Sequence, residues 1–146
     1  MTLGVCCSTN CFSYVIIDDS QDPPRIKKKE ALSVPKSGPQ GLVWMRKEIQ
    51  EITTKHKVKR LAYKRCETIR RPKDERTWLE GVMMEADFSV GVQDIRGFLK
   101  RQIASAVAFK GKARYVAGLL KGTAFESEMG TDFEEPILVA LAMMKS

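Results

Sequence analysis

The order of apolar and polar residues in the first third of the chain is typical of β-strands. Residues 2–7 and 12–18 are rich in Val, Ile, Phe and Tyr, and a Ser-Thr-Asn turn lies between them, so the pattern predicts a hairpin. Residues 25–34 are a weaker candidate for a third strand, with Ile26 as its apolar anchor. The segment 35–39 contains two prolines and a glycine, which predicts a break in regular structure.

Helical spacing follows this break. We expect a helix over about 40–57, because apolar residues recur there every three or four positions. That apolar face consists of Leu42, Val43, Met45, Ile49 and Ile52. The next segment, 58–64, predicts a short strand that ends in charge, and 69–72 predicts a basic loop.

The middle of the chain predicts two more helices with a strand between them. Residues 74–86 suit a helix, because acidic residues lie in the first turn, where the helix dipole favours them. The expected buried face of that helix is Trp78, Leu79, Val82, Met83 and Ala86, whereas Trp44 is expected to be partly exposed. Residues 88–92 fit a strand, and Asp94 is expected to cap a helix that runs to Ile103.

The last part of the chain predicts helices. One is expected over 112–120 and ends before Gly122, and another over about 134–144 with Pro136 in its first turn. A hairpin and a third strand, followed by helices that alternate with strands, predict an α/β domain with a mixed β-sheet flanked by helices. At 146 residues with no internal repeat, the chain is expected to form one domain over 1–146.

Positive charge is concentrated in two stretches of the chain. The formal net charge is +7, and residues 55–76 hold ten Lys or Arg against three Asp or Glu. Residues 25–29 form a smaller basic run. Clustered positive charge is typical of proteins that bind a polyanion, but it is equally typical of a solvated helix end and loop, so both interpretations stay open.

Hydropathy limits where the protein is expected to act. No apolar run approaches the roughly 18 residues that a membrane-spanning helix needs, so we expect no membrane partner. The first residues lack the charged region and long apolar stretch of a signal peptide, so a cytoplasmic location is expected.

The cysteines do not form a zinc-site pattern. Cys6, Cys7 and Cys11 cluster, while Cys66 and the only histidine, His56, lie apart. Zinc sites use paired Cys or Cys/His arms at regular spacing, and adjacent residues on a strand point to opposite faces. We therefore expect reduced, part-buried thiols rather than a structural metal.

Three short stretches carry a resemblance to a known family. Gly4-Val5-Cys6 ends the first strand before a polar turn, and Ala62-Tyr63-Lys64 ends a later strand. Asp132 and Glu135 stand three residues apart at the head of an Ala-rich helix. In this order the stretches resemble the active-site framework of RuvC-type Holliday-junction resolvases. These nucleases belong to the RNase-H-like superfamily, so the resemblance implies an RNase-H-like fold over most of the chain.

The resemblance also implies a metal-dependent nuclease site, but two of its acids are replaced. Cys6 stands where the family has an Asp, and Lys64 stands where it has a Glu. The catalytic carboxylates that remain are Asp132 and Glu135. Such nucleases hold Mg²⁺ or Mn²⁺ with oxygen ligands, and a thiol is a poor ligand for Mg²⁺ while an ammonium repels it. We therefore expect Lys64 to take the place of the metal, with Mg²⁺ or Mn²⁺ bound only if the protein is active.

Acids elsewhere offer an alternative ligand set. Glu67 follows Lys64 by three residues, but strand alternation places it on the opposite face unless the strand has already ended. Asp18 and Asp19 lie at the far end of the hairpin from Cys6. A rearranged active site is therefore disfavoured. Acids at the head of a helix also have a purely structural interpretation as partners of the helix dipole.

Three functions remain after these observations. The favoured one is a catalytically inactive nuclease-like protein, a pseudoenzyme, that binds DNA or RNA or a protein partner; active family members work as homodimers. The alternatives are an active metal-dependent endonuclease for branched or structured nucleic acid, and a structural or adaptor subunit of a larger complex. The residues expected to bind nucleic acid are Lys57, Lys59, Arg65, Arg70, Arg71, Lys73, Lys110, Lys112 and Arg114, of which the last three resemble a Lys-rich segment of the family.

Overall fold

The protein is described here by a computed structural model, which covers residues 1–67, 73–107 and 119–146. The predicted basic loop at 69–72 and nearly all of the predicted helix at 112–120 lie outside the described residues. The same is true of five residues expected to bind nucleic acid, which are Arg70, Arg71, Lys110, Lys112 and Arg114.

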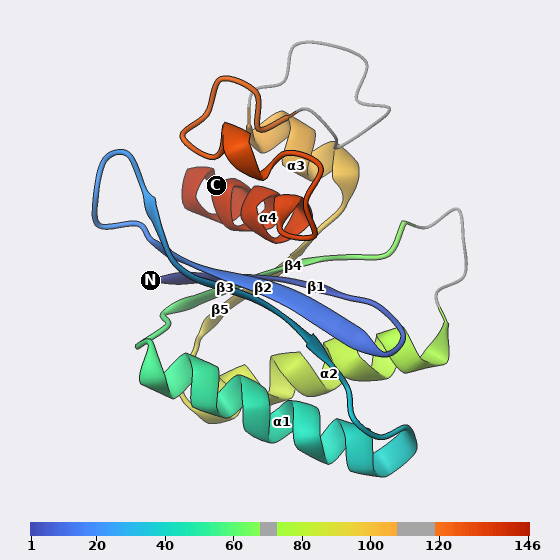
Figure 1. Cartoon of the computed structure of the whole chain (residues 1–146). Helices are drawn as coiled ribbons and strands as arrows, with labels where there is room; N and C mark the ends of the chain where they lie inside the picture. Colours follow the sequence, from blue (N-terminus) through green and yellow to red (C-terminus); the bar gives the residue numbers. More distant parts are fainter. Residues whose placement is uncertain (68–72, 108–118) are drawn as a thin grey trace.

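A five-stranded mixed sheet forms the centre of the molecule, in the order β3-β2-β1-β4-β5 (Figure 1). The strands are β1 (Thr2–Cys7), β2 (Cys11–Asp18), β3 (Arg25–Ser33), β4 (Arg60–Lys64) and β5 (Asp94–Phe98). The first three pair as an antiparallel meander, while β4 pairs parallel with both β1 and β5. The carboxyl ends of β1, β4 and β5 therefore meet at one edge of the sheet.

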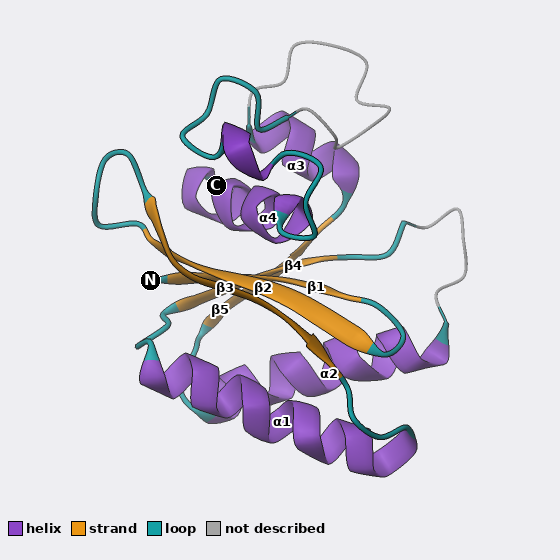
Figure 2. Ribbon diagram, viewed as in Figure 1, coloured by secondary structure: helices purple, strands orange, loops and turns teal. Residues whose placement is uncertain are grey.

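Helices cover both faces of the sheet. Figure 2 shows α1 (Gly38–Lys55) and α2 (Asp74–Ser89) on one face. The other face carries α3 (Lys100–Ala106) and α4 (Glu134–Lys145), with the short 3₁₀ helix η1 (Glu126–Glu128) beside them. Each face has its own hydrophobic core, and β2 and β4 contribute to both cores because side chains alternate along them.

The alternation on β1 decides what stands next to α4. Leu3, Val5 and Cys7 are buried in the core under α1 and α2, so the residues between them face α4. One of these is Gly4, where a Cβ atom would lie 2.0 Å from the Pro136 carbonyl oxygen. The absence of a side chain at this position lets the first turn of α4 rest directly on β1.

Several sequence predictions are confirmed. The hairpin, the third strand and the strand that ends at Lys64 are present, although β4 begins at Arg60 rather than at residue 58. The helix at 134–144 extends from Glu134 to Lys145 with Pro136 buried in its first turn. The helix expected at 40–57 runs from Gly38 to Lys55.

The prediction for residues 88–103 is wrong. Residues 88 and 89 still belong to α2, and a turn follows in which Gly91 has a φ of +98°. The expected helix that starts at Asp94 is instead β5 followed by α3. Asp94 does not cap a helix, because its carboxylate accepts a hydrogen bond from Arg96 Nε at 2.9 Å. Pairing with β4 outweighs the local helical pattern here.

Two burial predictions are also wrong. The side chain of Trp78 is 49% exposed and that of Val43 is 55% exposed. On α2 the buried residues are Leu79, Met83 and Ala86, which leaves Trp78 outside the face that packs on the sheet. Trp44 is half-buried, as expected, and its ring centroid lies 6.1 Å from that of Phe12. Among the described residues, no helix is long and apolar enough to span a membrane.

Candidate functional site

Cys6 and Glu135 meet at the carboxyl end of β1. Cys6 faces α4, and Glu135 is the second residue of that helix. The Cys6 thiol donates a hydrogen bond to Glu135 Oε2 at 3.2 Å. Burial raises the pKa of the thiol from 9.0 to about 12, and the negative charge of Glu135 adds to the effect. Cys6 is therefore a neutral hydrogen-bond donor at neutral pH, and not a thiolate ligand.

Lys64 ends the neighbouring strand β4. Thr2 to Val5 of β1 pair in register with Arg60 to Tyr63 of β4, so Cys6 and Lys64 occupy the next matching positions. The Lys64 side chain is only 4% exposed. Its ammonium donates to Glu67 Oε1 at 2.8 Å and to the Arg65 carbonyl oxygen at 2.5 Å. A buried positive charge, held by an acid and a carbonyl group, therefore stands at the end of β4.

Glu67 lies on the same side as Lys64, which is the exception that the sequence analysis left open for a strand that has already ended. The reason is that β4 ends at Lys64 and strand alternation stops there. Besides the Lys64 ammonium, Glu67 Oε1 accepts a hydrogen bond from the backbone N–H of Lys100 at 2.9 Å. Burial opposes ionisation of Glu67, but the hydrogen bonds and charges of these two lysines lower the pKa of its carboxyl.

Arg76 closes this cluster from α2. Its guanidinium donates to the Lys64 carbonyl oxygen at 3.2 Å and to Glu80 at 3.0 Å. The charge of Arg76 also acts on Cys6, where it lowers the thiol pKa and so opposes the effect of burial. Segments from β1, β4, α2, α3 and α4 thus converge at one edge of the sheet.

Two hollows open at this edge, and Glu135 lines both of them. The first, which we call the acidic hollow, has a volume of about 450 Å³ and is lined by Cys6, Cys11, Asp132, Glu134 and Glu135, among others. The second, which we call the basic hollow, has a volume of about 340 Å³ and is lined by Lys64, Arg65, Cys66, Glu67, Arg76, Lys100 and Glu135.

The sequence predicted four residues for this site, and three of them, Cys6, Lys64 and Glu135, lie together in the structure. Cys6 bonds Glu135, and Lys64 lines the basic hollow with Glu135. Asp132 is exposed and lines only the acidic hollow. Glu134, which the sequence analysis did not single out, is buried and accepts a hydrogen bond from the Gly130 backbone N–H at 2.7 Å.

The residues present do not fit a pair of magnesium ions. In the described parts of the chain, no three His, Cys, Asp or Glu side chains are grouped so that they could hold a metal ion. At the ends of β1 and β4 stand a neutral thiol and an ammonium, whereas Mg²⁺ takes oxygen ligands. Asp18 and Asp19 offer no replacement, because they lie at the end of β2 and just after it, at the opposite edge of the sheet, where Asp19 accepts a hydrogen bond from Thr2 Oγ1 at 2.6 Å.

The other cysteines are also placed. Cys7 is buried in the core under α1 and α2, on the face of the sheet opposite to Cys6, as predicted for adjacent strand residues. Cys11, the first residue of β2, has its Sγ 2.8 Å from Ser8 Oγ in the turn that precedes it. All four cysteines are free of disulfide bonds.

The residues expected to bind nucleic acid divide between two ends of β4. Lys57 and Lys59 precede β4, whereas Arg65 follows it and Lys73 stands just before α2. Lys100 was missed by sequence reasoning, and Arg76 was included only as the last residue of the basic stretch 55–76, although both line the basic hollow. Lys100 begins α3, two positions after β5 ends, and the wrong helix prediction for 94–103 hid that strand end.

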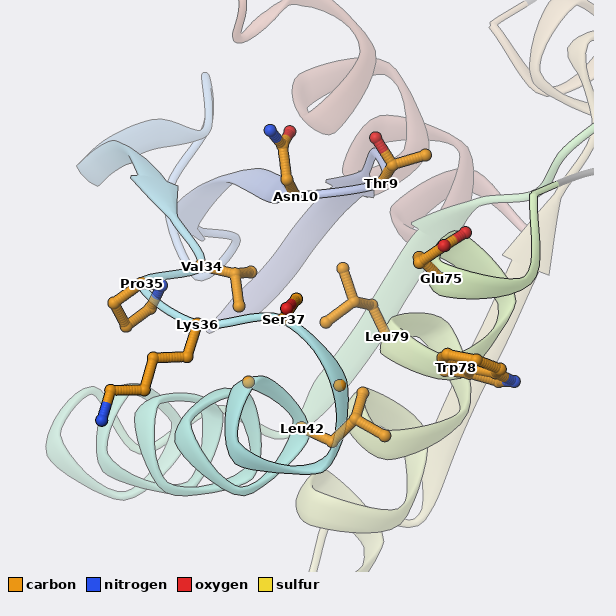
Figure 3. A pocket seen from close by; sticks show the side chains of 12 residues that line it. Thr9, Asn10, Val34, Pro35, Lys36, Ser37, Leu42, Glu75, Trp78 and Leu79 are labelled. Atoms are coloured by element: carbon orange, nitrogen blue, oxygen red, sulfur yellow. The ribbon is translucent and has the colours of Figure 1, made fainter.

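A third hollow lies away from this edge, between the turn after β1, the connection from β3 to α1, and α2 (Figure 3). Its volume is about 160 Å³. Leu42 and Leu79 point into the space between α1 and α2, while the Lys36 ammonium points away from it. The lining offers packing surface rather than a cluster of reactive groups.

Comparison with known proteins identifies the fold. The RuvC resolvase of Thermus thermophilus, in complex with a Holliday junction substrate, is similar with a TM-score of 0.73 at 15% identity, over 97% of this chain and 90% of that chain. A further structure of Thermus thermophilus RuvC has the same TM-score and identity, over 98% and 91%. The fowlpox virus resolvase in complex with Holliday junction DNA has a TM-score of 0.52 at 12% identity, over 98% and 95%.

No protein-family model matches the sequence, and no curated protein sequence matches it either. The structural similarity therefore rests on the fold alone. It confirms the predicted α/β fold class, a mixed sheet flanked by helices in the RuvC-type, RNase-H-like arrangement.

Proposed function

Since the chain has a RuvC-type fold, we propose that it binds nucleic acid at the carboxyl ends of β1 and β4 and does not cleave it by a two-metal reaction. The observation that carries the proposal is the buried Lys64 ammonium at the end of β4. A two-metal site needs a carboxylate there, because the metals stabilise the attacking and leaving oxygens from both sides of the phosphate. A fixed positive charge instead attracts the phosphate and repels the metal.

The surroundings of Lys64 support nucleic-acid binding. Arg65, Arg76 and Lys100 line the same hollow. Positive charge that is clustered at one place on the surface binds phosphates without regard to sequence, and the affinity then falls steeply as salt is added. The similar resolvases, whose structures contain Holliday junction DNA, make a four-way junction the first substrate to test.

The test is a binding and cleavage experiment on one labelled four-way junction. Fluorescence anisotropy is measured at increasing salt, first with EDTA and then with Mn²⁺. We expect binding that weakens with salt, is equal under both conditions, and leaves the junction intact. Cleavage in Mn²⁺ that is lost in Asp132→Asn would instead establish the active endonuclease. Absence of salt-dependent binding to DNA and RNA would leave the role of a structural or adaptor subunit as the remaining function.

A protein partner is a second candidate, and the outer surface of α2 favours it. The side chains of Trp78 and Phe88 on that helix are 49% and 64% exposed. Large exposed apolar side chains on one element are typical of protein–protein contacts. The simplest partner is a second copy of the chain. Light scattering after size exclusion measures the oligomeric state, and we expect Trp78→Ser with Phe88→Ser to shift a dimer to the monomer without loss of the fold.

A further inference from the structure

The carboxylate of Glu67 occupies the basic hollow as a ligand would. Its Oε1 accepts one hydrogen bond from the Lys64 ammonium at 2.8 Å and another from the Lys100 backbone N–H at 2.9 Å. One donor is a buried charge at the end of β4, and the other is the main chain of the first residue of α3, two positions after β5 ends. Two donors, one at the end of β4 and one at the start of α3, thus converge on one anionic oxygen.

Two other cations of the hollow form no hydrogen bond with this carboxylate. Among the described residues, neither the Arg65 guanidinium nor the Lys100 ammonium makes a hydrogen bond or an ion pair. The aliphatic part of Arg65 packs over Gly97, where a Cβ atom would lie 2.6 Å from Arg65 Cγ. The hollow is also lined by Glu135, but its four cationic side chains still outnumber its two carboxylates. A phosphate group, with several acceptor oxygens, matches that surplus better.

Glu67 can leave the hollow without unfolding the sheet. It lies beyond the last residue of β4, and its side chain is 35% exposed. Lys64 keeps the Arg65 carbonyl oxygen as a partner when Glu67 departs. Its buried ammonium then requires a new anion, because a buried charge without a counter-charge is unfavourable.

From these contacts we infer that the basic hollow is a phosphate-binding site whose internal occupant is the Glu67 carboxylate, and that a phosphate group of nucleic acid displaces it. This inference rests on the proposed nucleic-acid binding and specifies its chemistry. Glu67 competes with the phosphate for the Lys64 and Lys100 donors. It therefore weakens binding and keeps the hollow closed to weaker anions.

The test compares two variants that make the same change in net charge. Glu67→Gln removes the competing charge but keeps the shape of the side chain. Glu51→Gln removes a charge from the exposed surface of α1. Inorganic phosphate is titrated into ¹⁵N-labelled protein, and the amide signal of Lys100 reports the exchange of its acceptor. We expect Glu67→Gln to bind phosphate about tenfold more tightly than wild type, which corresponds to about 1.4 kcal/mol.

Lys64→Met gives the opposite arm of the experiment. It is expected to lose phosphate binding, and its melting curve shows whether the variant is folded. Should Lys64→Met fail to fold, Arg65→Gln with the Lys100 ammonium neutralised by Lys100→Gln replaces it, and phosphate binding is expected to fall at least fivefold.

The outcomes separate this inference from the proposed function. Equal tightening in Glu67→Gln and Glu51→Gln, or an unmoved Lys100 signal, overturns the inference, while salt-dependent junction binding of the wild type still upholds the proposed function. Phosphate that binds more tightly to Glu67→Gln and displaces junction DNA in competition supports both. If Glu67→Gln binds phosphate more tightly but the protein binds no nucleic acid, the phosphate that the hollow binds does not belong to nucleic acid, and that part of the inference is overturned.

Discussion

The two hollows beside Glu135 have opposite charge. Of the described residues, the acidic hollow is lined by three carboxylates and no Lys or Arg, whereas the basic hollow is lined by four cationic side chains and two carboxylates. A two-metal site needs acids on both sides of the phosphate. Here the acids lie on the α4 side, and the end of β4 is positively charged.

This contrast shows how much of the site depends on two side chains. The backbone pairing that places Cys6 beside Lys64 is ordinary parallel sheet. Nothing in that pairing requires a thiol or an ammonium. The chemistry of the site can therefore change while the fold stays the same, and the following experiments test that separation.

The largest effect is expected from reversing the charge on the basic side. In Lys64→Glu, a buried carboxylate would face Glu67 with no cation in Lys64's place, and breaking a buried ion pair costs about 3–5 kcal/mol. Urea unfolding at pH 7 measures this loss. With Cys6→Asp added, the ends of both strands carry acids like those on α4, and we expect Mn²⁺ to recover part of the lost stability.

The control for this prediction is Mn²⁺ added to wild type, which we expect to have no effect on the unfolding midpoint. Equal stabilisation of wild type and double variant by Mn²⁺ would mean that the native residues already hold the metal. That result would favour the active endonuclease over the binding protein.

A smaller loss of stability is expected when α4, which carries the carboxylates, is displaced from β1. Gly4→Ala places a Cβ atom 2.0 Å from the Pro136 carbonyl oxygen, so α4 has to move off β1. Overpacking of this kind costs about 1–3 kcal/mol. The shift also separates Glu135 from Cys6, which faster alkylation of Cys6 would report. Gly81→Ala is the matched control, because its Cβ meets nothing within 4 Å, and we expect it to be neutral or stabilising by up to about 1 kcal/mol.

The next effect concerns affinity rather than stability. Arg65→Gln with Lys100→Gln removes two charges from the basic hollow, and Lys57→Gln with Lys59→Gln removes two from the other end of β4. We expect the first pair to reduce the salt dependence of junction binding by about two phosphate contacts, a slope change of about 2 in log K against log salt. The second pair is expected to leave the slope within about 0.5 of wild type. An equal reduction of the slope in both double variants would mean that nucleic acid contacts the basic surface at both ends of β4.

The smallest effect is a difference in how the contributions of Cys6 and Glu67 to stability depend on pH. The pKa of Cys6 is raised from 9.0 to about 12, so its contribution to stability is complete below pH 9.0 and is lost as the pH rises above that value. The pKa of Glu67 is lowered from 4.5, so its contribution is present above pH 4.5 and is lost as the pH falls. Because Glu67 is partly exposed, we expect that loss to stay under about 1 kcal/mol.

Unfolding of Cys6→Ala and Glu67→Gln at pH 3, 7 and 10 separates the two contributions. Relative to wild type, Cys6→Ala is expected to flatten only the alkaline side of the stability profile, and Glu67→Gln only the acid side. A change on the same side in both variants would contradict the assignment of the alkaline loss to Cys6 and of the acid loss to Glu67.

The sequence predicted the parts of this fold in which local pattern and tertiary packing agree. The hairpin of β1 and β2 has strand-forming residues on both sides of a polar turn, and the helix that begins at Glu134 is apolar nearly all round, as suits a buried helix. These elements place Cys6 and Glu135, so their convergence could be foreseen. The resemblance to the resolvases added the order in which such residues occur.

The errors occur where long-range pairing determines the structure. β5 has an exposed arginine and a glycine within five residues, and only its pairing with β4 makes it a strand. The position of Glu67 depends on where β4 stops, which strand periodicity does not specify. Trp78 was expected in the core because its spacing on α2 fits an apolar face, but Leu79 and Met83 fill the space against the sheet.

The hydrogen bond between Cys6 and Glu135 joins residues that are 129 positions apart. At a synthesis rate of about 5–20 residues per second, several seconds therefore pass between the synthesis of β1 and that of α4. Lys64, Glu67, Arg76 and Lys100 are all made before Glu135. The cationic side chains of the basic hollow are thus present in the nascent chain before the carboxylates of α4. The Cys6 thiol on β1 is not covered by α4 during that interval.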